Sequence, residues 1–355
     1  MDTPSPRPKR RPRYSGRNPR RFDQKYKELD PEKYPETLQK VLDSGKTPAG
    51  MHRPVLVAEV LQVLKPAPGE FAVDATLGYG GHAGELLKAL QPGGTLLALD
   101  TDPIELPRTE ARLRAAGASA EALRVVQSNF AGLPRILGAL GIPGADLILA
   151  DLGCSSMQFD NPERGFSFKL EGPLDLRMNP NKGRPASAWL ASLKEPELRE
   201  ILIENSDEPH ASLLAGAVIR AQALKPLDTT SALARVLKGA LQTLPPQIRE
   251  QEGNTPLRRF FQALRIAVNE EFTALEMFLR ALPGCLKAGG RVAILTFHSG
   301  EDRRVKKAFQ AGLREGSYAE VADNVIRPSE EEIRSNPRAS SAKLRWAIRS
   351  AEVPE

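Results

Sequence analysis

Two carboxylates and a glycine turn stand where a parallel sheet would place a ligand. The stretch FAVDATLGYGGHAG, residues 71–84, runs from an apolar segment into Asp74, then Gly78 and Gly80, and Asp100 ends the next apolar segment. Glycines at this spacing let the backbone approach a bound group at the start of a helix, and an acid about twenty residues further on can bind ribose hydroxyls. The pattern predicts a ligand that contains a nucleoside.

The charge of Asp74 separates two classes of ligand. A dinucleotide would bring its pyrophosphate close to this carboxylate, and like charges repel. S-adenosylmethionine carries an ammonium and a sulfonium group beside an adenosine, so the same acids would attract it. The glycine pattern favours a methyltransferase, but it also leaves open a nicotinamide-dependent oxidoreductase or a site that only needs tight turns.

The segments around these residues alternate between strands and helices. Continuous apolar runs separated by helical segments favour a parallel sheet covered on both faces. These runs cover residues 71–75, 95–100, 123–128 and 145–153. After them come an irregular stretch and several segments of helical period, before the alternation resumes near Thr255. We therefore predict a doubly wound α/β domain over residues 51–153 and 256–355, with a mostly helical insertion at 154–255.

The second part of this domain begins with a helix-start pair, Thr255 and Pro256. Apolar residues at helical spacing from Leu257 to Leu279 predict one buried face. The opposite face is expected to carry polar residues, namely Arg258, Arg259, Arg265 and Asn269. The last strand is predicted at 343–349.

Composition excludes several classes of protein. The chain has 355 residues, 41% hydrophobic and 26% charged, as in a soluble globular protein. Two cysteines, Cys154 and Cys285, and four scattered histidines predict neither a disulfide framework nor a metal site. No signal peptide or membrane span is expected, so the predicted location is cytoplasmic.

The net charge of +6 comes from the N-terminus, because residues 1–21 carry eight Lys or Arg against one acid. Residues 1–50 are predicted to be a disordered basic tail and linker, with one short helix at 34–42. The tail either keeps the protein soluble or binds phosphates without sequence preference.

Separated blocks of sequence resemble one family. They read HRPVLVAEV (52–60), DATLGYGGHA (74–83), LALDTDP (97–103), DLGCSSMQFDNPERGFSF (151–168), GPLDLRM (172–178), FQALRIAVNEE (261–271), TFHSGEDRRVK (296–306) and NPRASSAKLR (336–345). In this order they are similar to the bacterial ribosomal RNA small-subunit methyltransferase H family, also called MraW. The resemblance implies a class I, Rossmann-like S-adenosylmethionine-dependent methyltransferase with an inserted helical domain. Its implied reaction is N4-methylation of a cytidine in the decoding region of 16S ribosomal RNA.

The resemblance also implies the residues of the site. Cofactor contacts are expected at Asp74, Gly78, Gly80, Gly81, His82, Asp100, Phe130, Asp151 and Gln158. Asp151 is the first candidate for orienting the cytosine amine, with Ser155 and His298 as weaker ones. Cys154 would suit a covalent mechanism, but a small buried residue is the preferred interpretation.

RNA contacts are expected from arginines in loops around the site. The candidates are Arg164, Arg177, Arg258, Arg259, Arg303 and Arg304. Phe159, Phe166 and Phe168 would either stack on a flipped base or close a small core. The partner is 16S ribosomal RNA or the small ribosomal subunit, and the sequence does not choose between them. A homodimer is compatible with the sequence, as is a non-catalytic RNA-binding protein that has kept the fold.

Overall fold

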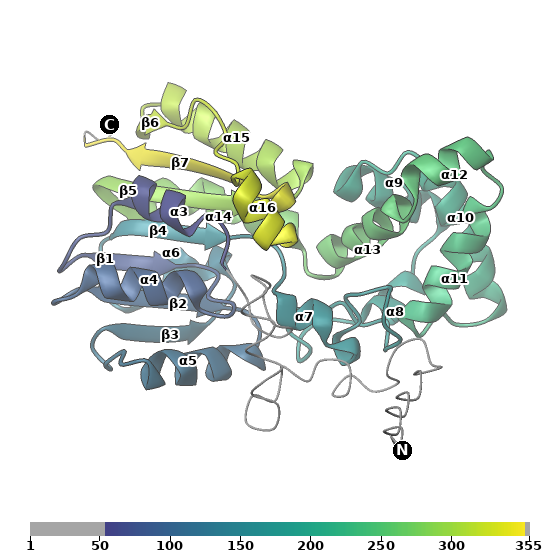
Figure 1. Ribbon diagram of the computed structural model, residues 1–355, viewed down its shortest axis with the longest axis horizontal. Coiled ribbons are helices and arrows are strands. Elements are labelled where there is room, and N and C mark those ends of the chain that lie inside the picture. The colour runs from purple at the N-terminus through teal and green to yellow at the C-terminus, as the bar shows by residue number, and fades with distance from the viewer. Residues whose placement is uncertain (1–53, 352–355) are drawn as a thin grey trace, which may run out of the picture. The chain divides into compact units, whose positions relative to one another are not determined.

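The computed structural model of the protein describes residues 54–351. The basic tail and linker predicted over residues 1–50, including the short helix at 34–42, lie outside the described residues. Within the described range the predicted α/β sheet is confirmed (Figure 1). Its strands are β1 (Phe71–Asp74), β2 (Thr95–Asp100), β3 (Leu123–Gln127), β4 (Ala145–Asp151), β5 (Leu286–Thr296), β6 (Tyr318–Val321) and β7 (Lys343–Arg349).

The sheet has seven strands in the order β3-β2-β1-β4-β5-β7-β6. Neighbours from β3 to β5 are parallel, and β7 runs antiparallel to both β5 and β6. The strand order reverses between β1 and β4: β2 and β3 are added on one side of β1, and β4 and β5 on the other. In a doubly wound sheet, ligands bind at the carboxyl ends of the strands near such a point.

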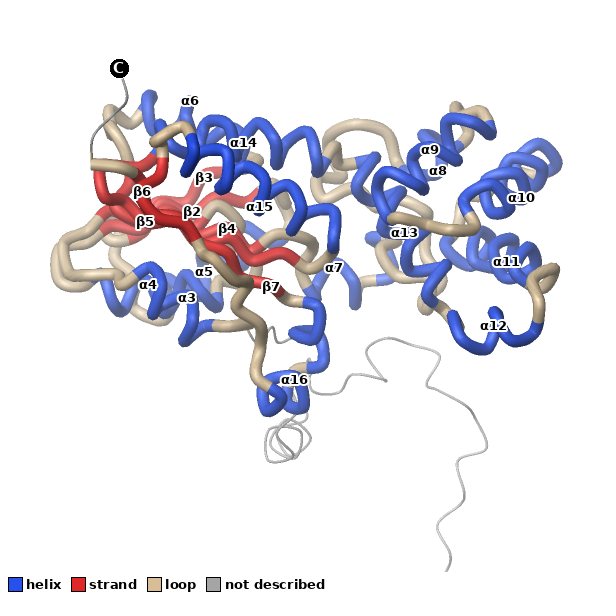
Figure 2. Tube along the Cα trace, turned by 90° about the horizontal axis from the view of Figure 1, so that it is seen from above, coloured by secondary structure: helices blue, strands red, loops and turns tan. Residues whose placement is uncertain are grey.

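Alternate side chains of the strands form two separate apolar cores. One core is covered by α3 (Val57–Leu64), α4 (Gly81–Leu90) and α5 (Glu105–Ala115). The other is covered by α6 (Leu133–Ala139), α14 (Glu271–Cys285) and α15 (Ser299–Arg314). Figure 2 shows α3 and α4 on one side of the sheet and α6, α14 and α15 on the other.

Helices occupy most of the chain between β4 and α14. They are α7 (Ser156–Asp160), the 3-10 turn η3 (Pro162–Arg164), α8 (Ala186–Leu190), α9 (Glu195–Ser206), α10 (Ala211–Leu224), α11 (Thr230–Leu241), α12 (Pro246–Glu252) and α13 (Thr255–Val268). A third apolar core lies among them, and Leu257, Phe260 and Leu264 of α13 belong to it. The helix α13 therefore packs with the preceding helices, although the sequence analysis grouped it with the second part of the sheet domain.

The predicted apolar face from Leu257 to Leu279 does not belong to one helix. The backbone leaves the helical conformation at Asn269, and Glu270 adopts a left-handed φ of 51° before α14 begins. The spacing of apolar residues continues across this break, because both helices bury their apolar side but in different cores. Three further elements were not predicted from the sequence: α12, and α16 (Glu330–Ser335) and the 3-10 turn η4 (Pro337–Ser341) before β7.

None of the helices in residues 54–351 is both long enough and apolar enough to cross a membrane.

Candidate active site

Three strands of the sheet end on acids at the same edge. Asp74 of β1 lies opposite Ala98 of β2 and Leu149 of β4. Asp100 and Asp151 therefore each lie two residues beyond this level, at the carboxyl ends of β2 and β4. The predicted carboxylates of this edge are brought together by the parallel register of the strands.

The glycine turn joins β1 to α4. Gly78 has a φ of 49° and Gly80 a φ of 82°, which is the left-handed region that glycine adopts without strain. The amide of Gly78 donates to Asp100 Oδ2 at 2.8 Å, and its carbonyl accepts from Thr109 Oγ1 at 2.6 Å. A Cβ on Gly81 would lie 2.8 Å from the ring of Pro54. Both the turn and the helix start behind it are therefore fixed by close packing.

Burial of the acids changes their ionisation. Burial, together with the charge of Asp100, raises the pKa of Asp74 to about 7, although the Thr76 amide opposes the shift. Burial raises the pKa of Asp151 to about 8, and the charges of Asp74 and Glu301 add to the shift. The pKa of Asp100 is also raised by burial, against hydrogen bonds from backbone amides. An edge with three buried or half-buried carboxylates favours a cationic ligand, because a nearby positive charge would stabilise the ionised forms.

Among the three acids at the ends of β1, β2 and β4, Asp151 has a carboxylate oxygen without a hydrogen-bond partner in the described residues. Its Oδ2 lies 3.8 Å from Nε2 of His82, and its backbone amide donates to Thr76 Oγ1 at 2.6 Å. Its Oδ1 is buried and has no hydrogen-bond partner among the described residues. Buried carboxylate oxygens are normally hydrogen-bonded, so this atom points to a missing donor.

Ser155 and His298, the two weaker catalytic candidates, are both used to start helices. The Ser155 hydroxyl accepts from the Gln158 amide at 3.4 Å, as the N-cap of α7. His298 is the N-cap of α15, and its Nδ1 accepts from the Glu301 amide at 3.4 Å. Its Nε2 lies 3.0 Å from Glu301 Oε1. Because the imidazole is directed at Glu301 through both nitrogens, it is poorly placed to take a proton from a substrate.

Glu301 is a member of the site that the sequence analysis missed. Its Oε2 accepts from the Phe297 amide at 2.8 Å. Burial opposes its ionisation, but His298, Arg265 and this amide together lower its pKa. The signal was present in the block TFHSGEDRR, where an acid three residues after a helix-start residue is the pattern of a capping box.

Arg265 was predicted on the polar face of a helix, opposite the apolar residues, but it is not exposed there. The side chain is buried and makes a two-pronged ion pair with Glu271, at 2.8 and 2.9 Å. Its third nitrogen lies 3.0 Å from the sulfur of Cys154. Burial raises the pKa of the Cys154 thiol to about 11, although Arg265 opposes the shift. The thiol is therefore neutral near pH 7, as expected for a packing residue and not for a nucleophile.

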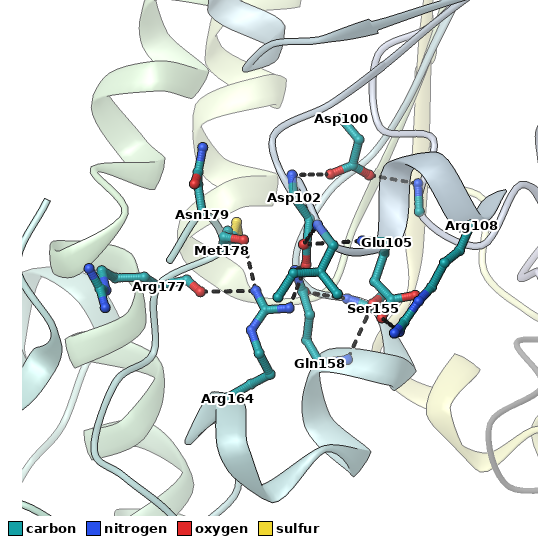
Figure 3. Close-up of polar contacts among 12 residues, drawn as sticks. Asp100, Asp102, Glu105, Arg108, Ser155, Gln158, Arg164, Arg177, Met178 and Asn179 are labelled. Atoms are coloured by element: carbon teal, nitrogen blue, oxygen red, sulfur yellow. Dashed lines mark hydrogen bonds and ion pairs between the residues drawn. The ribbon is translucent and has the colours of Figure 1, made fainter. Parts of the chain in front are cut away.

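A buried polar network that was not predicted from the sequence lies next to Asp100 (Figure 3). Asp102 is 1% exposed, and its Oδ2 accepts from Arg164 at 2.8 Å and from Gln158 Nε2 at 2.9 Å. The side-chain oxygen of Gln158, Oε1, accepts from the Ser155 amide at 3.0 Å. Gln158 was expected to contact the cofactor, but both ends of its side chain are bonded within the protein.

Arg164 was expected to contact RNA, and its position contradicts this. The side chain is 6% exposed, and its second amine donates to the carbonyls of Arg177 and Met178 at 3.1 and 2.8 Å. The sequence could not show this, since its partner Asp102 is 62 residues away. Arg164 is therefore not placed to bind an RNA phosphate.

The other predicted RNA-binding arginines differ in how freely they can bind a phosphate. Arg177 is paired with both oxygens of Asp175, and Arg304 is bonded to Glu276 and stacked on a phenylalanine ring. Arg303 is 54% exposed, though it pairs with Asp207 at 3.0 Å. Arg259 is 4.0 Å from the buried Glu208, and exposed Arg258 has no ion pair among the described residues.

The aromatic residues considered for stacking on a base or cofactor differ in how far they are buried. Phe166 is buried, and Phe168 packs against Phe261 at a ring distance of 5.7 Å. Phe159 is exposed to 39%. Phe130, predicted to face the adenine, lies in a turn after β3 and packs one side on Phe278 at 5.3 Å.

Comparison with known proteins identifies the family. The family model described as MraW methylase matches residues 49–350. Ribosomal RNA small subunit methyltransferase H 2 of Alkaliphilus metalliredigens is 52% identical over 352 residues, which cover 99% of this chain and 100% of that protein. Ribosomal RNA small subunit methyltransferase H 1 of Lachnoclostridium phytofermentans is 49% identical over 343 residues, covering 96% and 93%.

Solved structures were also matched. NSun6 from Pyrococcus horikoshii gives a TM-score of 0.42 at 15% identity, covering 85% of this chain and 53% of that one. An S-adenosylmethionine-dependent O-methyltransferase from Thermotoga maritima gives 0.40 at 11% identity, covering 90% and 72%.

The strand order, with an antiparallel β7 between β5 and β6, and the acids at the carboxyl edge define a class I S-adenosylmethionine-dependent methyltransferase. The match over nearly the whole chain makes the assignment narrower. The chain belongs to the MraW methylase family.

Proposed function

We propose that the protein transfers a methyl group from S-adenosylmethionine to the exocyclic N4 of a cytidine in the decoding region of 16S ribosomal RNA. The observation that carries the proposal is the unpartnered, buried Oδ1 of Asp151 at an edge of raised-pKa carboxylates. Such an edge suits a cationic ligand and has an acceptor left over for an amine. The names of the relatives supply the substrate class, ribosomal RNA of the small subunit.

The cofactor would be held by residues of the glycine turn and the strand ends. Gly78, Gly80, Gly81 and His82 would line its methionine side, with Asp74 ordering the loop. Asp100 would accept from the ribose hydroxyls, because each carboxylate oxygen can take a further hydrogen bond beside its backbone amide. Phe130 would lie against the adenine. When bound, the sulfonium group supplies the electrophilic methyl group.

The protein must make a poor nucleophile reactive. The lone pair of the cytosine amine is delocalised into the ring, so catalysis has to align the amine and accept a proton or hydrogen bond as the nitrogen becomes tetrahedral. Asp151 Oδ1 is the acceptor that the described residues leave free for this task. A cation next to Asp151 would lower its pKa from about 8 and keep the acceptor ionised.

Ser155 and His298 take supporting parts in this proposal. Ser155 starts the helix after β4, and His298 starts the helix after β5, so both shape the walls on either side of Asp151. Gln158 acts through Asp102 and not by touching the cofactor.

RNA phosphates would be bound by the exposed cations of the helical insertion and of α15. Arg258 and Arg303 are the best placed by exposure, followed by Arg259. Arg177 and Arg304 would first have to break their ion pairs with Asp175 and Glu276 before they could bind a phosphate.

Incubation with methyl-labelled S-adenosylmethionine and small ribosomal subunits that lack the modification tests the proposal. Label in the small-subunit RNA, but not in large subunits treated in the same way, is the expected result. Binding of S-adenosylmethionine without any transfer of the methyl group would favour the alternative of a non-catalytic RNA-binding protein. Failure to bind S-adenosylmethionine would contradict the proposed function itself.

A further inference from the structure

A continuous chain of polar contacts runs from the ribose-side acid to the helical insertion (Figure 3). The amide of Asp102 donates to Asp100 Oδ1 at 2.9 Å. The carboxylate of Asp102 holds Arg164, and Arg164 holds the carbonyls of Arg177 and Met178. The first members of this chain touch the proposed ribose site, and the last belong to the segment between α7 and α8.

The chain continues to the end of α13. The amide of Met178 donates to Asn269 Oδ1 at 2.7 Å, and Asn269 Nδ2 donates to the Leu176 carbonyl at 2.8 Å. Asn269 is the C-cap residue of α13, at the break before α14. The guanidinium group of Arg164 thus joins Asp102 to residues 177 and 178, and Asn269 joins the same segment to the end of α13.

The backbone around Arg164 is packed too closely to move independently. A Cβ on Gly165 would overlap the carbonyl oxygen of Pro173, and one on Gly172 would overlap that of Pro162. The amide of Leu176 also donates to the Arg164 carbonyl at 3.1 Å. A shift of Arg164 would therefore shift the segment 172–178 with it.

We propose that Arg164 is a positioning residue that couples occupation of the nucleoside site to the placement of segment 172–178 for RNA. The inference rests on the proposed function, because it needs a ribose on Asp100 and RNA on the insertion. A ligand that orders Asp100 also fixes the Asp102 amide, and through Arg164 it fixes the segment. Coupling of this kind is reciprocal, so RNA that orders the segment should tighten binding at the nucleoside site by the same factor.

The choice of side chain supports a geometric task. A buried ion pair is often no better for stability than apolar residues of the same volume, because both charges lose their hydration. Arginine offers a rigid planar fork of donors, which here bonds to acceptors of two different segments. Lysine would keep the charge opposite Asp102 but would lose the two carbonyl contacts.

The variant Arg164→Lys therefore separates the coupling from the ion pair. Its matched control is Arg338→Lys, because Arg338 also pairs with a single carboxylate, that of Asp160 at 3.0 and 3.1 Å, but is 54% exposed. The probe is S-adenosylhomocysteine, which binds without reacting. Hydrogen exchange of the amides of residues 172–178 is measured with and without it, and its Kd is measured with and without small subunits.

In the wild type and in Arg338→Lys, S-adenosylhomocysteine should slow exchange in 172–178, and small subunits should tighten its binding. Arg164→Lys should lose the slowing and bring the two Kd values to within about two-fold of each other, with KM for small subunits raised about ten-fold. Wild-type slowing in Arg164→Lys would overturn the inference. If Arg164→Lys does not fold, Asp102→Asn combined with Arg164→Gln removes both charges together and is judged by the same exchange. Absence of S-adenosylhomocysteine binding by the wild type would instead count against the proposed function.

Discussion

Binding of S-adenosylmethionine should release protons from the acids at the carboxyl edge of the sheet. In the free protein, burial raises the pKa of Asp74 to about 7 and that of Asp151 to about 8. At pH 7 about half of the first group and about nine-tenths of the second are then protonated. A bound cation favours the ionised forms, so binding at pH 7 should release roughly one proton.

The sign of the pH dependence follows from this release. Binding should strengthen by about a factor of ten per pH unit near pH 7, for one proton released, and level off above about pH 9 where both acids are already ionised. Titration calorimetry in buffers of different ionisation enthalpy measures the number of protons directly.

Two controls sharpen the measurement. S-adenosylhomocysteine has no sulfonium charge, so it should release fewer protons than S-adenosylmethionine. The variant Asp151→Asn has one titrating acid fewer and should also release less. Uptake of protons at pH 7, or affinity that does not change between pH 6 and 8, would refute the reasoning.

Three further predictions follow from the same residues. Because Asp74 and Asp151 hold protons in the folded protein at pH values where the unfolded chain has lost them, the free energy of unfolding should fall by several kcal/mol between about pH 4 and pH 9 and then level off; urea titration across this range should show no such fall in the doubly substituted Asn variant. Gly80→Ala should weaken S-adenosylmethionine binding at least about ten-fold, because φ is 82° and the new Cβ would lie 2.8 Å from a threonine methyl group; Gly138→Ala, with open space at its Cβ, should leave binding unchanged and raise stability by about 0.5–1 kcal/mol. Cys154→Ala should keep kcat within about three-fold, since a thiol with a pKa of about 11 is not a nucleophile near pH 7; loss of all turnover would revive a covalent mechanism.

The parts of the fold that could be predicted are those set by local patterns. The buried strands at 95–100 and 343–349 have the bounds read from their apolar runs. The helix start at Thr255 follows from the proline at the next position. The break at Glu270 could not be predicted, because apolar spacing continues across it while two different cores receive the two helices.

In the candidate site, too, the features set by local sequence could be predicted, and those set by contacts between distant residues could not. The acids Asp74, Asp100 and Asp151 come together because each ends a strand, and because the parallel register places these strand ends at the same edge of the sheet. The inward direction of Arg164 and Arg265 depends on the acids that face them. A charged residue in a loop reads as exposed until its partner is known, and the partner of Arg164 lies on a different strand end.

We propose above that the protein methylates the exocyclic amine of cytosine at the carboxyl edge of the sheet, next to Asp151. Nucleoside analysis by mass spectrometry, after reaction of the wild type and Asp151→Asn with unmodified small subunits, tests it most directly. We expect N4-methylcytidine from the wild type and a loss of at least about a hundred-fold in its rate of formation by Asp151→Asn, with S-adenosylmethionine still bound. Label found in 5-methylcytidine, or full turnover by Asp151→Asn, would contradict it.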